Sequence, residues 1–226
     1  MTEYRIFERS AALLVIAWLT QAACGADERD YYRIVTISAP KAQTDSRSAT
    51  WKAAPDSLVL EVSGLAPLED GRLGVAIRKG EVWLLDGVYD EPPRNVTYHQ
   101  FASALHEPLG LLWHKGAFYS AQRSELTAMR DLDGDDVADE YRTVAKGWGV
   151  TGHYHEYAYG PKLDGQGNLW LTLNIGLGLK GDQLTRALFE PTLHVRQGRW
   201  RGWGLKATDS GELVPMCAGM RSPIGL

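Results

Sequence analysis

Short segments of alternating apolar and polar residues recur along the second part of the chain, each after a glycine turn. Residues 67–76, 108–120 and 161–172 share one order: a proline, a glycine turn and then an alternating segment. Alternation with a period of two predicts β-strands that bury one face. Long runs with helical periodicity are missing, and only residues 182–189 indicate a short helix. The pattern therefore predicts an all-β chain.

The spacing of these segments predicts a repeating sheet. Leu73, Phe118 and Leu169 occupy matching positions that are 45 and 51 residues apart, and residues 101–111 resemble residues 216–226. A repeat of this length, built from strands and glycine turns, is typical of one four-stranded propeller blade. We expect a partial (open) β-propeller of about three to four blades. A β-sandwich with accidental internal similarity is the alternative.

The repeat also sets the expected domains. Residues 58–226 form the incomplete propeller, and residues 27–57 form an N-terminal strand, at 31–37, followed by a linker. Residues 216–226 are interpreted as the start of a further blade. Three or four blades cannot close a ring, and open sheets leave edges exposed. We interpret the chain as an N-terminal fragment of a longer propeller, or as half of one that a second chain completes.

Residues 1–26 are typical of an export signal. Arginines flank the apolar residues 11–19, and small residues follow them. The apolar core is too short to span a bilayer, which needs about 20 residues. Cys24 resembles the lipid-attachment cysteine of a bacterial lipoprotein, but Gln21 makes ordinary cleavage an equal alternative, and a buried N-terminal helix is a third. We expect an exported protein, periplasmic or anchored to the cell envelope, in which Cys217 has no disulfide partner.

Composition changes this picture little. The chain has 226 residues, 24 glycines, eight tryptophans and ten tyrosines, which favours many short strands and turns. Its formal net charge is −4, and no basic cluster stands out. We therefore expect no nucleic-acid partner.

An acidic loop predicts a calcium site. Alternate carboxylates and a backbone carbonyl in a tight turn can supply the six to eight oxygens that calcium prefers. The expected ligands are Asp131, Asp133, Asp135, Val137 and Asp139. Asp136 replaces the usual glycine and Arg142 replaces the usual glutamate, so the loop is not an EF-hand. We expect a structural calcium ion that fixes the loop leading into the histidines; a solvated acidic turn is the alternative.

Two histidines carry the clearest candidate chemistry. His153 and His155 are two residues apart, so on an extended segment both side chains leave on the same face. They can act as a general base or as metal ligands, and Glu156 can orient one imidazole if the chain bends. Trp148 and nearby glycines and tyrosines would shape a pocket around them. A hydrogen-bonded structural pair is the alternative.

Further residues can contribute to the same rim. Arg123 follows a strand, and Asn174 ends one beside a glycine-rich exit, so we include them with Trp148 as candidate cofactor-binding residues. Trp200 and Trp203 flank Arg201, which would place a cation between two rings. We favour core packing for these tryptophans.

Taken together, these motifs resemble the quinoprotein glucose/sorbosone dehydrogenase-like propellers, in particular the membrane-bound dehydrogenases of planctomycete-type bacteria. The resemblance covers about residues 58–226. The resemblance rests on the proline-glycine blade openings and on residues 131–139, 152–161, 200–203 and 221–226.

The resemblance implies a six-bladed parental propeller that uses pyrroloquinoline quinone and calcium to oxidise a sugar or alcohol. A histidine, His155 or His153, would take the hydroxyl proton while hydride passes to the quinone, and a cytochrome c-type protein would accept the electrons. Most quinone-binding arginines and lysines would lie in blades outside this chain. The alternative is a non-catalytic, calcium-stabilised propeller that binds or scaffolds carbohydrate or protein.

Overall fold

The computed structural model describes residues 31–37, 61–150, 155–176 and 199–226. The chain divides into two compact units, residues 1–36 and 37–226. Residues 31–37 are exposed and form neither helix nor strand, so the strand predicted there is absent. The predicted export signal and most of the predicted linker lie outside the described residues. The described part contains no helix that is long and apolar enough to cross a membrane.

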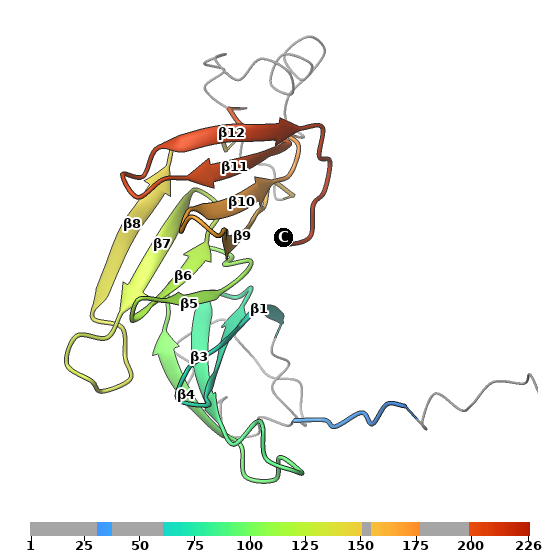
Figure 1. Ribbon diagram of the computed structural model, residues 1–226, viewed down its shortest axis with the longest axis vertical. Coiled ribbons are helices and arrows are strands. Elements are labelled where there is room, and N and C mark those ends of the chain that lie inside the picture. The colour runs from blue at the N-terminus through green and yellow to red at the C-terminus, as the bar shows by residue number, and fades with distance from the viewer. Residues whose placement is uncertain (1–30, 38–60, 151–154, 177–198) are drawn as a thin grey trace, which may run out of the picture. The chain divides into compact units, whose positions relative to one another are not determined.

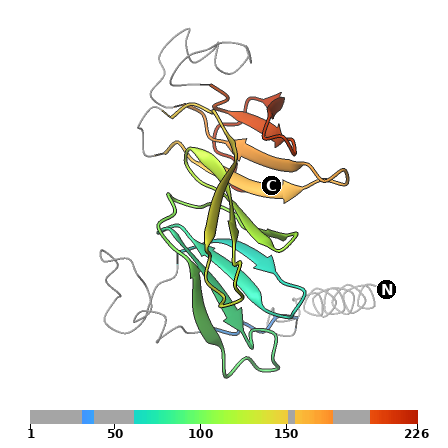
Figure 2. The same cartoon turned by 90° about the vertical axis from the view of Figure 1, so that its left-hand side faces the viewer.

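Within the described residues, twelve strands form three sheets of four, all in the second unit (Figures 1 and 2). The first sheet contains β1 (Val62–Pro67), β2 (Leu73–Ile77), β3 (Glu81–Asp86) and β4 (Thr97–Ala102). The second contains β5 (Leu112–His114), β6 (Ala117–Ala121), β7 (Glu125–Arg130) and β8 (Glu140–Lys146). The third contains β9 (Ala158–Leu163), β10 (Leu169–Leu173), β11 (Trp203–Ala207) and β12 (Leu213–Ala218).

Each sheet is an antiparallel meander in chain order, which is the topology of a propeller blade. The first strands of successive sheets, β1, β5 and β9, lie next to one another. Figure 1 shows the three sheets following one another without closing a ring. The predicted all-β, partial propeller is therefore confirmed, with three blades in the described residues. The β-sandwich alternative is wrong because the strands form three separate meanders.

The repeat positions found in the sequence are equivalent in space. Leu73, Phe118 and Leu169 all lie on the second strand of their sheet. The turns that precede these strands contain glycines with positive φ. These are Gly71 (φ 87°), Gly116 (φ 69°) and Gly167 (φ 86°). The shared turn explains why a glycine recurs before each alternating segment.

Two apolar layers hold the sheets together, one on each face of the middle sheet. Phe118 packs toward the first sheet, with its ring centroid 5.0 Å from that of Phe101, in a buried cluster that also contains Val82 and Leu84. The adjacent Tyr119 packs toward the third sheet, in a cluster with Leu171. Because successive strand residues point to opposite faces, the alternating pattern fills both layers.

Glycines let the backbones of the inner strands touch. A Cβ added to Gly64 would lie 2.5 Å from the backbone of Gly110, and one added to Gly110 would lie 2.5 Å from the carbonyl oxygen of Gly160. The Gly160 amide donates a hydrogen bond of 2.8 Å to the carbonyl of Leu109. Gly110 and Gly160 have φ values of 112° and 125°, which other residues rarely adopt. These contacts fix the spacing between the three blades.

Candidate functional site

The described residues of the loops after β2, β6 and β10 and of the connections between sheets lie at one end of the blades, which we call the site face. The β3–β4 and β7–β8 registers show that these loops share an end: Val82 pairs with Ala102, and Glu125 with Lys146. A hydrogen bond confirms it, since the Trp148 indole N–H donates to the carbonyl of Arg123 at 2.7 Å. Every predicted catalytic and cofactor-binding residue within the described ranges lies on this face.

An ionic cluster joins all three blades on the site face; we call it the arginine cluster. Glu107 accepts hydrogen bonds from Arg123 at 2.8 Å and from Arg78 at 3.1 Å. Arg78 also donates to the Tyr157 hydroxyl at 2.9 Å, and both guanidinium groups lie within 6 Å of the Tyr157 ring centroid. Such proximity between cations and a ring face is favourable.

The electrostatics of Glu107 follow from this arrangement. Partial burial alone would raise the pKa of the Glu107 carboxyl, but the hydrogen bonds and charges of Arg123 and Arg78 outweigh it, so its pKa lies below the ordinary value. Two arginines thus share the carboxylate of Glu107.

His155 and Glu156 have different surroundings although they are adjacent. His155 is exposed, its ring meets that of Tyr157 edge-on at 6.4 Å, and its carbonyl accepts a hydrogen bond of 2.9 Å from the Asn174 amide. Glu156 is completely buried near the charge of Arg201. His153 lies outside the described residues, so the predicted pairing of the two imidazoles stays a prediction.

The three predicted cofactor-binding residues divide in the same way. Trp148 and Arg123 are buried in structural contacts. The Trp148 indole bonds the Arg123 carbonyl, and the Arg123 guanidinium pairs with Glu107. Asn174 is also buried, but it lines a cavity together with His155, and its side-chain oxygen has no hydrogen-bond partner within the described part of the chain. Only Asn174 of the three is therefore placed beside the candidate base.

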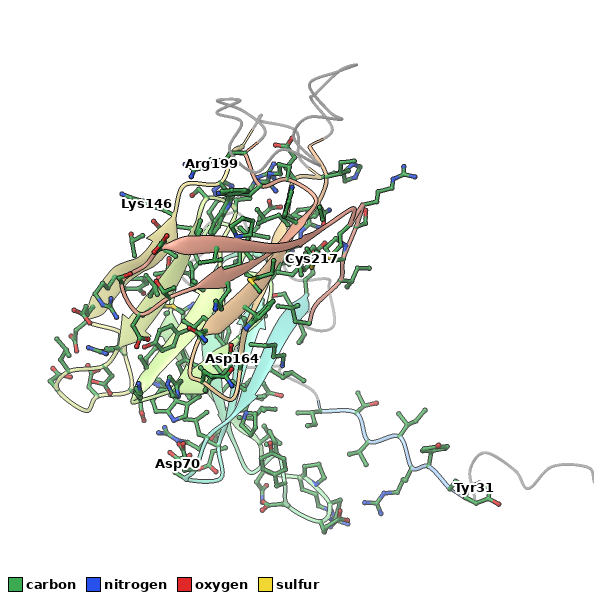
Figure 3. The ribbon with its side chains drawn as sticks, turned by 45° about the horizontal axis from the view of Figure 1, so that its top comes forward. Tyr31, Asp70, Lys146, Asp164, Arg199 and Cys217 are labelled. Carbon is green, nitrogen blue, oxygen red and sulfur yellow. The ribbon has the colours of Figure 1, made fainter. Side chains whose placement is uncertain are left out.

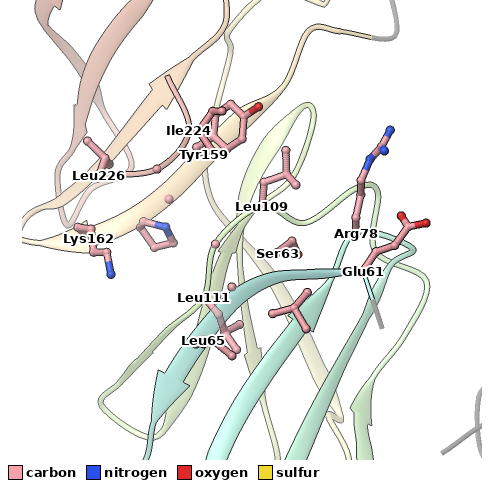
Figure 4. A pocket seen from close by; sticks show the side chains of 16 residues that line it. Glu61, Ser63, Leu65, Arg78, Leu109, Leu111, Tyr159, Lys162, Ile224 and Leu226 are labelled. Carbon is pink, nitrogen blue, oxygen red and sulfur yellow. The ribbon is translucent and has the colours of Figure 1, made fainter. Parts of the chain in front are cut away.

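Two neighbouring cavities adjoin His155 and the inner strands. The smaller, about 330 Å³, is lined by His155, Tyr157, Tyr159, Asn174, Ile175, Arg221, Ser222 and Ile224. The larger, about 620 Å³, lies along the inner strands, with Arg78 and Glu61 on one side and Lys162 on another (Figure 4). Tyr159 and Ile224 line both cavities. Burial raises the pKa of the Tyr159 hydroxyl, and the nearby side-chain amide of Asn174 partly opposes that effect.

The acidic loop lies at the other end of the blades, between β7 and β8; we call this the acidic-loop end. Arg130 pairs with Glu140 beside the loop, whereas Glu125 pairs with Lys146 at the site face. Five residue steps of strand, roughly 17 Å, separate the two ends. The expectation that the loop lies beside the histidines is therefore wrong for His155, because a whole strand intervenes.

The loop itself brings three of its carboxylates together. One oxygen each of Asp131, Asp133 and Asp139 lies within 4.8 Å of the others. The charges of Asp135 and then Asp139 raise the pKa of Asp133, which shows repulsion that a cation would relieve. Desolvation would raise the pKa of Asp131, but hydrogen bonds from the amides of residues 133, 134 and 136 outweigh it and lower that pKa.

The loop is attached to the first sheet. Asp136, which replaces the glycine of common calcium loops, adopts a φ of 65° and pairs with Arg72 at 2.8 Å. The Ala138 amide donates to the carbonyl of Phe101 at 2.8 Å. Val137 donates its amide to Asp135, a carboxylate that is not one of the three that converge.

Arg199, and not the predicted Arg201, is the arginine that lies over one of the two tryptophan rings. Arg199 lies over the Trp200 ring at 5.0 Å, and Trp200 meets Trp203 edge-on at 5.9 Å. Both tryptophans are buried, as favoured from the sequence. Arg201 instead is completely buried and bonds the carbonyls of Gly149 and Tyr157. Burial lowers its pKa to about 10, and the charge of Glu156 opposes that effect.

Sequence reasoning missed Arg78, Glu107 and the guanidinium of Arg221 as parts of the site. A signal was present, because residues 101–111 and 216–226 align His106 with Arg221 just before equivalent inner segments. Arg78 and Arg123 likewise follow equivalent strands, β2 and β6. An alignment of the blades position by position would have shown that His106 matches Arg221 and that Arg78 matches Arg123.

This fold and site define an open β-propeller blade array with a cationic, tyrosine-lined site face. No family model matches the chain, and no curated protein matches it. Among solved structures it is similar to an oxidoreductase described as a glucose dehydrogenase from Thermus thermophilus, with a TM-score of 0.52 and 20% identity over 74% of this chain and 54% of that one.

A second structure, titled a glucose dehydrogenase, gives a TM-score of 0.51 and 15% identity, covering 73% of this chain and 53% of that chain. The PQQ-bound aldose sugar dehydrogenase of Streptomyces coelicolor gives a TM-score of 0.49 and 17% identity, covering 68% and 46%. The chain thus spans about half the length of the structures it matches. The first two likenesses show that the chain has the fold of a partial β-propeller.

Proposed function

We propose that the chain is part of an exported, quinoprotein-type dehydrogenase that oxidises a hydroxyl group of a sugar or alcohol. The observation that carries the proposal is the exposed imidazole of His155 in a cavity of about 330 Å³ on the site face. The propeller fold shared with glucose dehydrogenases supports it. In this proposal residues 1–26 direct export, and Cys24 is the site of any lipid anchor.

The residues present suit pyrroloquinoline quinone, an aromatic ring system with several carboxylates. Arg78 and Arg221 place guanidinium groups at the two cavities, and Tyr157 and Tyr159 supply rings and hydroxyls. The side-chain oxygen of Asn174, which lacks a partner among the described residues, marks a polar position beside the same cavity. The arginines would hold the carboxylates. When bound, the quinone would supply a two-electron acceptor for the hydride of the substrate C–H bond.

His155 would act as the general base. It would take the proton of the substrate hydroxyl while the carbonyl product forms, and its exposure lets the imidazole reach a substrate. Glu156 would not take part directly, because it is completely buried and lines neither cavity. A cytochrome c-type acceptor would remove the electrons, and a second chain or further blades would complete the ring.

We propose calcium for the acidic loop, with a structural role. Asp131, Asp133 and Asp139 would provide the first ligands, and Asp135 and the carbonyl of Val137 would add to them. The raised pKa of Asp133 supports a cation there. Because this loop lies at the end opposite to His155, the ion would fix the β7–β8 hairpin and leave the base untouched.

Quinone binding and turnover test the proposal in one series. The longer, complete propeller that we propose contains this chain is titrated with pyrroloquinoline quinone in the presence of calcium, and dye-linked oxidation is measured with a panel of sugars and alcohols. We expect saturable quinone binding, and we expect His155→Gln to lower turnover by about 10²–10⁴-fold while quinone binding remains. His99→Gln, an exposed histidine on β4, is the matched control. Equal turnover in His155→Gln and wild type would exclude His155 as the base.

A non-catalytic propeller that binds carbohydrate is the second candidate. It is favoured by the burial of Arg123, Trp148 and Glu156 in structural contacts, which removes three predicted site residues from the cavities. In that case sugars would bind without quinone, and quinone titrations would show no saturation. Titrations with the same sugars, with and without quinone, therefore separate the two functions.

A further inference from the structure

Arg201 closes the two ends of the segment that carries His155. Its Nε donates 2.6 Å to the carbonyl of Gly149, and its Nη1 donates 3.0 Å to the carbonyl of Tyr157. These two carbonyls bracket the connection between β8 and β9. One guanidinium thus joins both ends of that connection to the third sheet.

Asn174 holds the same segment from the end of β10. Its side-chain amide donates 2.9 Å to the carbonyl of His155, and its backbone amide donates 3.1 Å to the carbonyl of Tyr157. The backbone adds one further link, from the Gly149 amide to the carbonyl of Arg199 at 2.8 Å. The backbone of His155 is therefore fixed by bonds on both sides and at its own carbonyl.

The use of a buried arginine at this place needs a reason, because taking a guanidinium out of water is costly. An apolar residue of similar size would pack without that cost, and buried ion pairs are often replaceable in this way. Glu156 offsets part of the cost from within the segment itself. A planar guanidinium directs donors on different nitrogen atoms at the two carbonyls, whereas the three donors of a lysine ammonium all leave from one atom on a flexible stem.

We infer that Arg201 is a positioning residue that, with Asn174 as a second tether, fixes the backbone on which His155 is presented to the cavity. The inference rests on the proposed role of His155 as the base. Arg201 itself lines neither cavity, so it acts through the segment and not on a ligand.

Amide hydrogen exchange of Arg201→Lys tests the inference. We expect exchange at Gly149, Tyr157 and Asn174 to accelerate about tenfold or more, because a charge-assisted hydrogen bond is lost at each end. Exchange in β6 and β7 should stay as in wild type. Arg199→Lys is the matched control, since the guanidinium of Arg199 stacks on Trp200 instead. Unchanged exchange in the segment, or an equal rise in all three sheets, would overturn the inference.

The imidazole resonances of His155, assigned with His155→Gln, supply a readout that a merely structural role would not move. We expect one sharp set in wild type, and broadened or multiple sets in Arg201→Lys at equal thermal stability. A sharp, unshifted set in a variant with faster exchange would leave Arg201 structural only and overturn the inference. Absence of turnover in wild type would count against the proposed function. Amide exchange and the His155 resonances do not depend on turnover, so the two failures can be told apart.

If Arg201→Lys does not fold, the double variant Arg201→Met/Glu156→Gln replaces it. Removing both charges avoids a buried carboxylate without a partner, which is the costly state. The expected results are the same, and wild-type exchange and resonances in this variant would again contradict the inference.

Discussion

The two ends of the blades are stabilised in different ways. On the site face, bonds join residues far apart in sequence, as in the contact of Arg78 with Tyr157 or of Arg201 with Gly149. At the acidic-loop end most bonds are local, between carboxylates and amides two to five residues away. Turns at that end, such as the one closed by Asp164 between β9 and β10, follow the same rule (Figure 3). The bonds of the site face therefore depend on the whole fold, whereas most bonds of the acidic loop depend on residues of the loop itself.

Alanine at Gly110 should have the largest effect. Its Cβ would meet the carbonyl of Gly160 at 2.5 Å, and the φ of 112° would be strained. We expect a loss of about 4 kcal/mol in the free energy of unfolding, measured by urea denaturation. Gly116→Ala, in an open turn at the other end of the blade, should cost about 1 kcal/mol. Similar losses in the two variants would remove the claim that the inner strands set the blade spacing.

Arg123→Met should come next. Only 9% of the Arg123 side chain is exposed, and removing it takes from the partly buried Glu107 one of its two arginine partners. We expect a loss of about 3 kcal/mol by the same measurement. Arg130→Met breaks a partly exposed pair with Glu140, at 3.7 Å, near the acidic loop and should cost less, about 1 kcal/mol. A larger loss of stability in Arg130→Met than in Arg123→Met would contradict the difference between the two ends.

Acidification should act on Glu107 and on Asp133 with opposite signs. The pKa of Glu107 is lowered in the folded state, so its stabilisation is present above the ordinary value of 4.5 and is lost as the pH falls through the folded value. Asp133 has a raised pKa, so protonation relieves repulsion and favours the folded state as the pH falls. Urea midpoints between pH 6 and pH 3 should therefore fall less steeply in Glu107→Gln than in wild type. Parallel curves would show that Glu107 contributes no such linkage.

Asp133→Asn should give the smallest effect, and its sign should depend on calcium. In EDTA the variant should match or slightly exceed wild type in thermal stability, because one of the repelling charges is gone. With calcium in excess, wild type should become the more stable, since binding to the folded state alone raises stability. His155 resonances should not respond to the metal, given the intervening strand. If calcium does not change the thermal stability of wild type, the proposed calcium site is wrong.

The alternation of apolar residues and the recurrence of glycines were enough to predict the blades. Leu73, Phe118 and Leu169 were placed on equivalent strands because strand periodicity and turn chemistry are local properties of a chain. The acidic loop was likewise visible, since three of its carboxylates converge within nine residues of sequence.

The site could be predicted only in part, because its bonds cross blades. No local pattern indicates that Arg78 reaches Tyr157, or that Glu156 turns inward while its neighbour His155 stays exposed. Burial depends on which surfaces meet after folding, and so do the bonds of Arg201 to two distant carbonyls. The sequence by itself determined the blade and its candidate residues. The packing of one blade on the next decided which of those residues reach a cavity.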